Sequence, residues 1–94
     1  MACSLSDRLT AAPNVVFRAL GGEAIVLDLD GGVYFGLDEV GTRIWTLLPS
    51  HDLAGVAAAL VSEYDVEPLE AEGDVLAFAD ELAAKRLVQR AADG

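Results

Sequence analysis

The segment from Leu27 to Trp45 restricts the fold of this chain more than any other part of it. It reads LDLDGGVYFGLDEVGTRIW, which predicts the end of one strand, a diglycine turn, a second strand and the start of a helix. Val33 to Leu37 is rich in the β-branched and aromatic residues that favour a strand, and Gly31-Gly32 can adopt the positive φ that a tight turn requires. A short strand at a sheet edge offers unpaired backbone donors and acceptors to another chain. We therefore interpret Val33 to Leu37 as a strand on which a peptide can dock.

Two further strands are predicted before this one, at Pro13 to Leu20 and at Glu23 to Leu29, because apolar residues alternate along both segments. The pair Gly21-Gly22 joins them, so the three strands form a β-meander. The alternation places two sets of apolar side chains on one face of their strands: Val15, Phe17 and Ala19 on the first strand, and Ile25, Leu27 and Leu29 on the second.

Helical signals follow the meander. Asp38 stands where a helix N-cap is expected, and the apolar residues after it recur at helical spacing until Pro49, which cannot continue a helix. Asp52 is the expected N-cap of a second helix, from Leu53 to Tyr64. Its apolar residues show the cleanest helical periodicity in the chain. The sequence therefore predicts two helices directly after the meander.

A third helix is predicted from Pro68 to about Leu87. Its apolar residues form two adjacent stripes, which together are wider than one core contact requires. The stripes consist of Leu76, Ala79 and Ala83 on one side and Val75, Phe78 and Leu82 on the other. We expect one of them to face a groove.

Three strands followed by three helices predict an α+β fold. We expect a winged-helix-like arrangement, in which a three-stranded antiparallel β-meander packs on a three-helix bundle. A chain of 94 residues is large enough for one core and too small for two, so residues 1–94 are expected to form a single domain. Residues 1–12 and 89–94 carry no predicted element and are expected to be flexible.

The composition narrows the classes of partner. Asp and Glu outnumber Lys and Arg by 16 to 6, and the resulting net charge of −10 repels phosphate backbones. The 53% hydrophobic content suggests apolar surface that a partner covers. No apolar run approaches the roughly 20 residues that a membrane-spanning helix needs. The chain is therefore expected to be a soluble, cytoplasmic protein that binds neither nucleic acid nor membrane.

No catalytic or metal-binding pattern is found. The only histidine, His51, and the only cysteine, Cys3, are far apart in the sequence, and Cys3 stands near a terminus. The run Asp28 to Gly31 lacks the spaced carboxylates of a calcium loop, and Gly31-Gly32 lacks the following Lys or Ser of a phosphate-binding loop. We expect no metal, no cofactor and no enzymatic activity.

The distributed pattern from Val33 to Trp45, preceded by Ile25 to Leu29 and followed by Asp74-Val75 and Leu82, resembles the PqqD-like family. Members of this family are small domains that capture the leader segment of ribosomally made precursor peptides. The resemblance extends from about Val15 to about Val88 and is greatest to the stand-alone recognition proteins of lasso-peptide pathways. Asp38 replaces an Asn that is usual in the family, and both residues cap helices.

The resemblance implies that a leader peptide lies antiparallel to the third strand, in the cleft between that strand and the third helix. Carried over by position, the peptide-binding residues are Val33, Tyr34, Phe35, Leu37, Asp74, Val75, Phe78, Leu82 and Lys85. The plainer interpretation of the apolar members, that they fill the core, stays open at this point. Register alone decides which face of a strand is buried.

The function expected from these observations is to bind a precursor's leader and to present it to a separate modifying enzyme, with the leader peptidase of a lasso-peptide pathway as the first choice. The resemblance also permits a partner of a radical SAM peptide-modifying enzyme. A winged-helix DNA-binding regulator shares the element order, but the segment from Leu53 to Tyr64 contains no Lys or Arg. A generic interaction module is a further alternative, and an uncovered sheet edge could also pair two copies into a homodimer.

Overall fold

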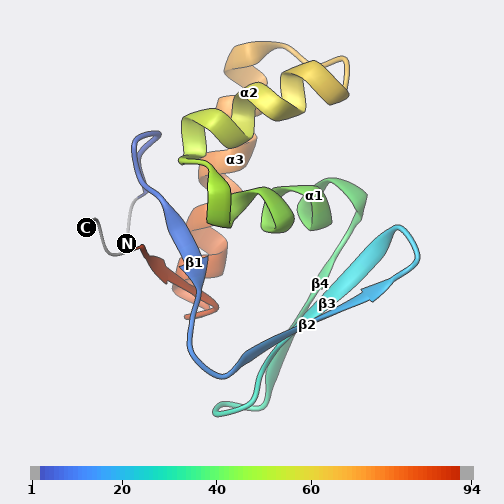
Figure 1. Ribbon diagram of the computed structural model, residues 1–94, viewed down its shortest axis with the longest axis vertical. Helices are drawn as coiled ribbons and strands as arrows, with labels where there is room; N and C mark the ends of the chain where they lie inside the picture. Colours follow the sequence, from blue (N-terminus) through green and yellow to red (C-terminus); the bar gives the residue numbers. More distant parts are fainter. Residues whose placement is uncertain (1–2, 92–94) are drawn as a thin grey trace.

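The computed structural model describes residues 3–91, and it confirms an α+β fold with three α-helices and antiparallel sheets in this part of the chain (Figure 1). The strands are β1 (Leu9–Ala11), β2 (Val15–Leu20), β3 (Glu23–Asp28), β4 (Val33–Leu37) and β5 (Val88–Arg90). The helices are α1 (Glu39–Leu47), α2 (Leu53–Glu63) and α3 (Pro68–Ala84), with a 3-10 turn, η1 (Leu48–Ser50), between the first two.

The predicted meander is confirmed. Strands β2, β3 and β4 form an antiparallel sheet in that spatial order, so β4 is an edge strand. Gly21 and Gly32 have φ of 69° and 67°, which places one glycine of each connecting turn in the left-handed region that other residues avoid. The tight turns therefore fix the register and leave β4 on the outside of the sheet.

The buried face of β3 is the one opposite to Ile25, Leu27 and Leu29. Ala24 and Val26 are buried, whereas Leu29 is 59% exposed and Ile25 and Leu27 are half-buried on the outer face. The alternation was ambiguous because β3 is apolar on both faces, and pairing with β4 decides the matter: Val26 lies opposite Phe35 and Ala24 opposite Leu37.

Both predicted N-caps are confirmed. The amide of Gly41 donates to Asp38 Oδ1 at 2.8 Å, and the amide of Gly55 donates to Asp52 Oδ1 at 2.8 Å. These carboxylates satisfy amides that have no acceptor within the first helical turn. Asp38 thereby fixes the start of α1 directly after the edge strand.

Helix α3 ends at Ala84, earlier than the predicted end near Leu87. Arg86 adopts a left-handed conformation with φ of 60°, its amide donates to the carbonyl of Ala83, and the amide of Leu87 donates to the carbonyl of Leu82. This pair of hydrogen bonds is a Schellman motif, which normally has glycine at the left-handed position. Because arginine occupies the position where glycine is usual, this motif could not be predicted from the sequence.

The ends of the described chain pair with each other. Strands β1 and β5 form a two-stranded antiparallel sheet in which Leu9 lies opposite Arg90, and Leu9 is fully buried. The amide of Cys3 also donates to Asp80 Oδ1 at 2.7 Å, which ties the N-terminal segment to α3. Residues 3–12 and 89–91, which were predicted to be flexible, thus include the short strand β1 and most of the short strand β5, and residues 1–2 and 92–94 of that prediction lie outside the described part.

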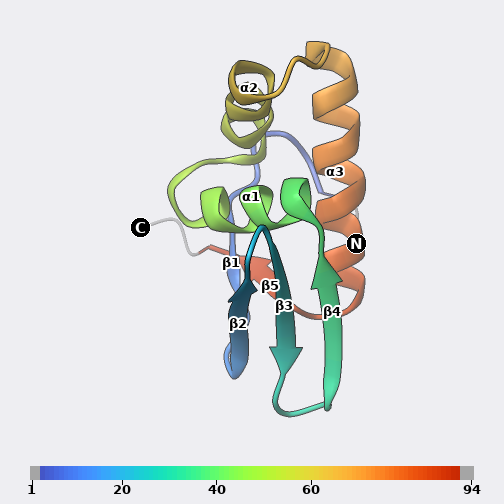
Figure 2. The same ribbon diagram turned by 90° about the vertical axis from the view of Figure 1, so that its right-hand side faces the viewer.

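The core lies between the helices and the inner faces of the sheets. Its largest fully buried side chains are Leu9, Val26, Leu53, Val56, Val75, Leu82 and Leu87. Strand β2 is covered by the stacking of Phe17 on Trp45, whose ring centroids are 6.3 Å apart. Within residues 3–91, none of the helices combines the length and the apolar character needed to span a bilayer. The three-stranded sheet projects from the helical part, and β4 is its strand nearest α3 (Figure 2).

Candidate functional site

One edge of β4 pairs with β3, and within the described residues the other edge has no strand partner. Alternate residues of an antiparallel edge strand direct their N–H and C=O groups outward. On this side β4 faces helix α3 (Figure 2), and the space between the two contains a cavity. The unpaired backbone groups of β4 therefore lie beside this cavity.

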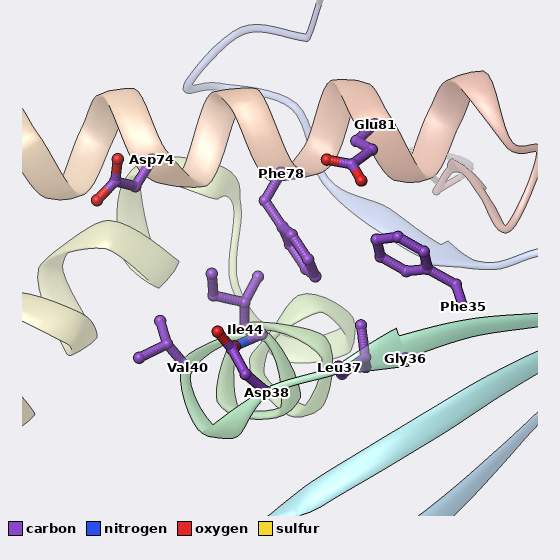
Figure 3. Close-up of a pocket in the computed structure, with 10 residues that line it drawn as sticks. Phe35, Gly36, Leu37, Asp38, Val40, Ile44, Asp74, Phe78 and Glu81 are labelled. Atoms are coloured by element: carbon purple, nitrogen blue, oxygen red, sulfur yellow. The ribbon is translucent and has the colours of Figure 1, made fainter.

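The cavity at the Leu37 end of β4 has a volume of about 510 Å³ and receives side chains from β4, α1 and α3 (Figure 3). The Phe78 ring extends from α3 toward β4, and its centroid lies 6.2 Å from that of Phe35. We call this hollow the first cavity. Its lining residues are Phe35, Gly36, Leu37, Asp38, Val40, Gly41, Ile44, Asp74, Phe78 and Glu81.

The ring of Phe78 reaches this position because Gly41 has no side chain. A Cβ atom at Gly41 would lie 3.2 Å from Phe78 Cζ and 3.2 Å from Asp38 Oδ1, closer than ordinary van der Waals contact. Gly41 is itself buried in the first turn of α1. The absence of a side chain at Gly41 therefore allows Phe78 to form one wall of the first cavity.

Three carboxylates, from Asp38, Asp74 and Glu81, line the first cavity. Asp38 is engaged as the cap of α1, whereas Asp74 and Glu81 are exposed and their carboxylates accept no hydrogen bond from residues 3–91. No Lys or Arg of the described chain lines this cavity. The first cavity therefore combines an aromatic centre with an acidic rim.

A second cavity, of about 640 Å³, lies at the Val33 end of β4. The ammonium group of Lys85, one of its lining residues, lies 5.4 Å from the ring centroid of Phe35, a distance suitable for a cation–π interaction. The two cavities therefore adjoin where Lys85 covers Phe35, and we call them together the β4–α3 groove. The second cavity is lined by Pro13, Asp28, Asp30, Gly31, Val33, Ala84, Lys85 and Arg86.

Six of the nine residues carried over from the family line the groove. Phe35, Leu37, Asp74 and Phe78 line the first cavity, and Val33 and Lys85 line the second. Leu37 is only 3% exposed, so its contact with the cavity is small.

The other three line neither cavity of the groove. Tyr34 is 71% exposed and lies on the outer face of the sheet, because neighbouring residues of a strand point to opposite faces. Val75 and Leu82 are fully buried in the core, so a peptide lying in the groove has no access to them. The wide apolar surface of α3 thus divides into a core stripe with Val75 and Leu82 and a groove wall with Phe78.

Sequence reasoning did not assign several lining residues to the site, namely Gly36, Asp38, Val40, Gly41, Ile44 and Arg86. Asp38 had a usable signal, since a cap placed directly after the docking strand must lie at the end of that strand. Gly41 and Arg86 had none, because their roles depend on the approach of Phe78 and on the Schellman motif.

Cys3 and His51, the two residues considered for catalysis, make separate contacts. Burial, together with the nearby carboxylate of Asp80, raises the pKa of the Cys3 thiol to about 11, so the thiol stays protonated at neutral pH. His51 Nδ1 lies 2.9 Å from Ser50 Oγ and 3.2 Å from the carbonyl oxygen of Leu47. Across the described chain, no three His, Cys, Asp or Glu side chains are grouped so that they could hold a metal ion.

Comparison with known proteins gives a family match and two similar solved structures. Residues 23–88 match the family described as coenzyme PQQ synthesis protein D (PqqD). TbiB1 in complex with the TbiA(beta) leader peptide is 36% identical, with a TM-score of 0.80, and the match covers 89% of this chain and 99% of that one. A lasso peptide synthetase B1 complexed with its leader peptide is 29% identical, with a TM-score of 0.79, covering 87% and 98% of the two chains. No curated protein matched the sequence.

Proposed function

This chain belongs to the PqqD family, and on that premise we propose that it is an accessory protein that binds the leader segment of a ribosomally synthesised precursor peptide. The observation that carries the proposal is the open edge of β4 beside the β4–α3 groove. The two similar structures, each solved with a leader peptide, support it.

Binding would occur by strand addition. The leader lies antiparallel to β4, and its backbone pairs with the outward N–H and C=O groups of that strand, which gives affinity independent of sequence. Alternate leader side chains enter the first cavity and contact Phe35 and Phe78, which gives selectivity. In this account Val33 and Lys85 contact the following part of the leader, and Val75 and Leu82 act only by supporting α3 from the core.

The modifying chemistry would belong to another protein. Holding the leader raises the effective concentration of the attached core peptide near a separate active site. The leader peptidase of a lasso-peptide pathway is the partner that the similarity to the B1 proteins favours, and a radical SAM peptide-modifying enzyme is the alternative partner. We further propose that the protein acts in the cytoplasm and that a homodimer paired through β4 would compete with the leader for the same edge.

A winged-helix-like DNA-binding regulator is the alternative from a different functional class. The net charge of −10 opposes DNA binding, and α2 contains no Lys or Arg that could contact phosphates. Leader binding therefore accounts better for both the charge and the open strand.

The proposal is tested by identifying a precursor-peptide gene in the neighbourhood of the gene for this chain, titrating the protein with the labelled leader of that precursor and following fluorescence anisotropy. Phe78→Asp places a charge in the aromatic centre of the groove, and we expect it to weaken binding at least tenfold, which corresponds to about 1.4 kcal/mol.

Leu69→Asp is the matched control, because it adds the same charge to the same helix at a residue that is 82% exposed and lines neither cavity of the groove. The control should bind like the wild type. Equal affinity of a folded Phe78→Asp variant, or absence of saturable binding to the wild type, would contradict the proposal.

A further inference from the structure

The two ends of the β4–α3 groove differ in charge, because three carboxylates and no cation line the Leu37 end, whereas two cations and two carboxylates line the Val33 end. We propose that this difference selects leaders by the order of their charged residues. A basic leader residue is accepted at the Leu37 end of β4, and an acidic residue further along the leader is accepted at the Val33 end. This inference rests on the proposed function and adds to it a requirement on the ligand.

The Leu37 end is acidic without compensation. Asp38 lines it from the end of β4, and Asp74 and Glu81 line it from α3, on either side of Phe78 along the helix (Figure 3). The nearest cation in α1, Arg43, is already paired with Glu63 at 2.8 Å across the α1–α2 contact. A basic side chain in the first cavity would therefore meet carboxylates that the described chain leaves without a cation.

The Val33 end presents two cations, Lys85 and Arg86. Two carboxylates also line this cavity. Neutral donors hold them in the turns without removing their charge: Asp30 Oδ2 accepts from Asn14 Nδ2 at 3.0 Å, and Asp28 Oδ1 accepts from the amide of Asp30 at 3.0 Å. Within residues 3–91, neither Lys85 nor Arg86 forms an ion pair, so an acidic leader side chain can pair with a cation at this end and not at the Leu37 end.

The conformation of Arg86 gives separate support. Its φ of 60° places a charged residue at the left-handed position of the Schellman motif, where glycine would be free of strain. This conformation costs stability, and Arg86 lines the second cavity. A role in binding an anionic group would account for arginine in place of glycine.

The direction of the leader and the spacing of its charges follow from strand geometry. A leader antiparallel to β4 passes the Leu37 end first, so its basic residue precedes its acidic one. Strand β4 has five residues, and an extended chain advances about 3.4 Å per residue. The two charges should therefore be separated by about four to six positions in the leader.

The test uses two labelled forms of the neighbouring precursor's leader that have the same composition. One form has Lys before and Glu after the segment that pairs with β4, and the other has these two residues exchanged. We expect the wild type to bind the first form about tenfold more tightly at low salt, and the difference should shrink at high salt because screening weakens exposed charge pairs.

The double variant Asp74→Lys/Lys85→Glu keeps the net charge and should reverse this preference. Glu70→Lys, which makes the same charge change as Asp74→Lys at an exposed residue of α3 outside the groove, should leave the preference unchanged. If the double variant loses its fold, the milder variants Asp74→Asn and Lys85→Gln should each reduce the preference. Equal binding of both leader forms to the wild type would overturn the inference while leaving leader binding intact, whereas failure of both forms to bind would overturn the proposed function itself.

Discussion

At the scale of single residues, Gly41 and Phe78 determine the shape of the first cavity. Any Cβ at position 41 would push on the Phe78 ring and on the carboxylate that caps α1. Glycine in a helix normally costs about 1 kcal/mol relative to alanine, so its presence in the first turn of α1 needs a reason of this kind. The close approach of the ring supplies that reason.

Gly41→Ala should therefore weaken leader binding several-fold by displacing Phe78, and fluorescence titration measures this effect. Gly73→Ala is the matched control, because Gly73 is exposed in α3 and a Cβ there would have no neighbour within 4 Å. The control should keep its leader affinity and gain about 1 kcal/mol in free energy of unfolding, measured with urea. An affinity loss of the same size in both variants would remove the special role of Gly41.

At the scale of elements, the pairing of β1 with β5 connects the two ends of the described chain. Both strands have only three residues, yet Leu9 in β1 and Leu87, directly before β5, are fully buried. Leu9 lines neither cavity of the groove, so its contribution to stability can be separated from binding.

Leu9→Ala should lower the free energy of unfolding by about 2–5 kcal/mol, because it removes a buried leucine side chain and leaves a cavity. Urea unfolding measures the loss, and leader affinity under conditions where the variant is folded should match that of the wild type. A loss below about 1 kcal/mol would mean that β1 does not anchor the chain in solution.

At the scale of the whole molecule, the sequence predicted what local signals determine. Strand β4, the two N-caps and the order of the meander and helices could all be predicted, because turn glycines, capping carboxylates and periodicity act within a few residues. The pairing of β1 with β5 could not, because three-residue strands far apart in the sequence leave no such signal.

The site was predicted in part for the same reason. The open edge followed from the position of β4 in the chain, but the buried face of β3 could not be predicted because that strand is apolar on both faces. On α3, spacing alone could not separate Phe78 in the groove from Val75 and Leu82 in the core, since all three share an apolar side of the helix. Which of these side chains lies in the core depends on how β4 and α1 pack against α3, and residue spacing does not show this packing.

The most direct test of leader addition to β4 is amide hydrogen exchange, followed residue by residue by NMR with and without the leader. In an antiparallel edge strand, alternate amides point outward, so alternate amides of Val33–Leu37 should gain protection while those of α2 stay unchanged. Unchanged exchange throughout β4 at saturating leader, or protection confined to α2, would contradict strand addition at this edge.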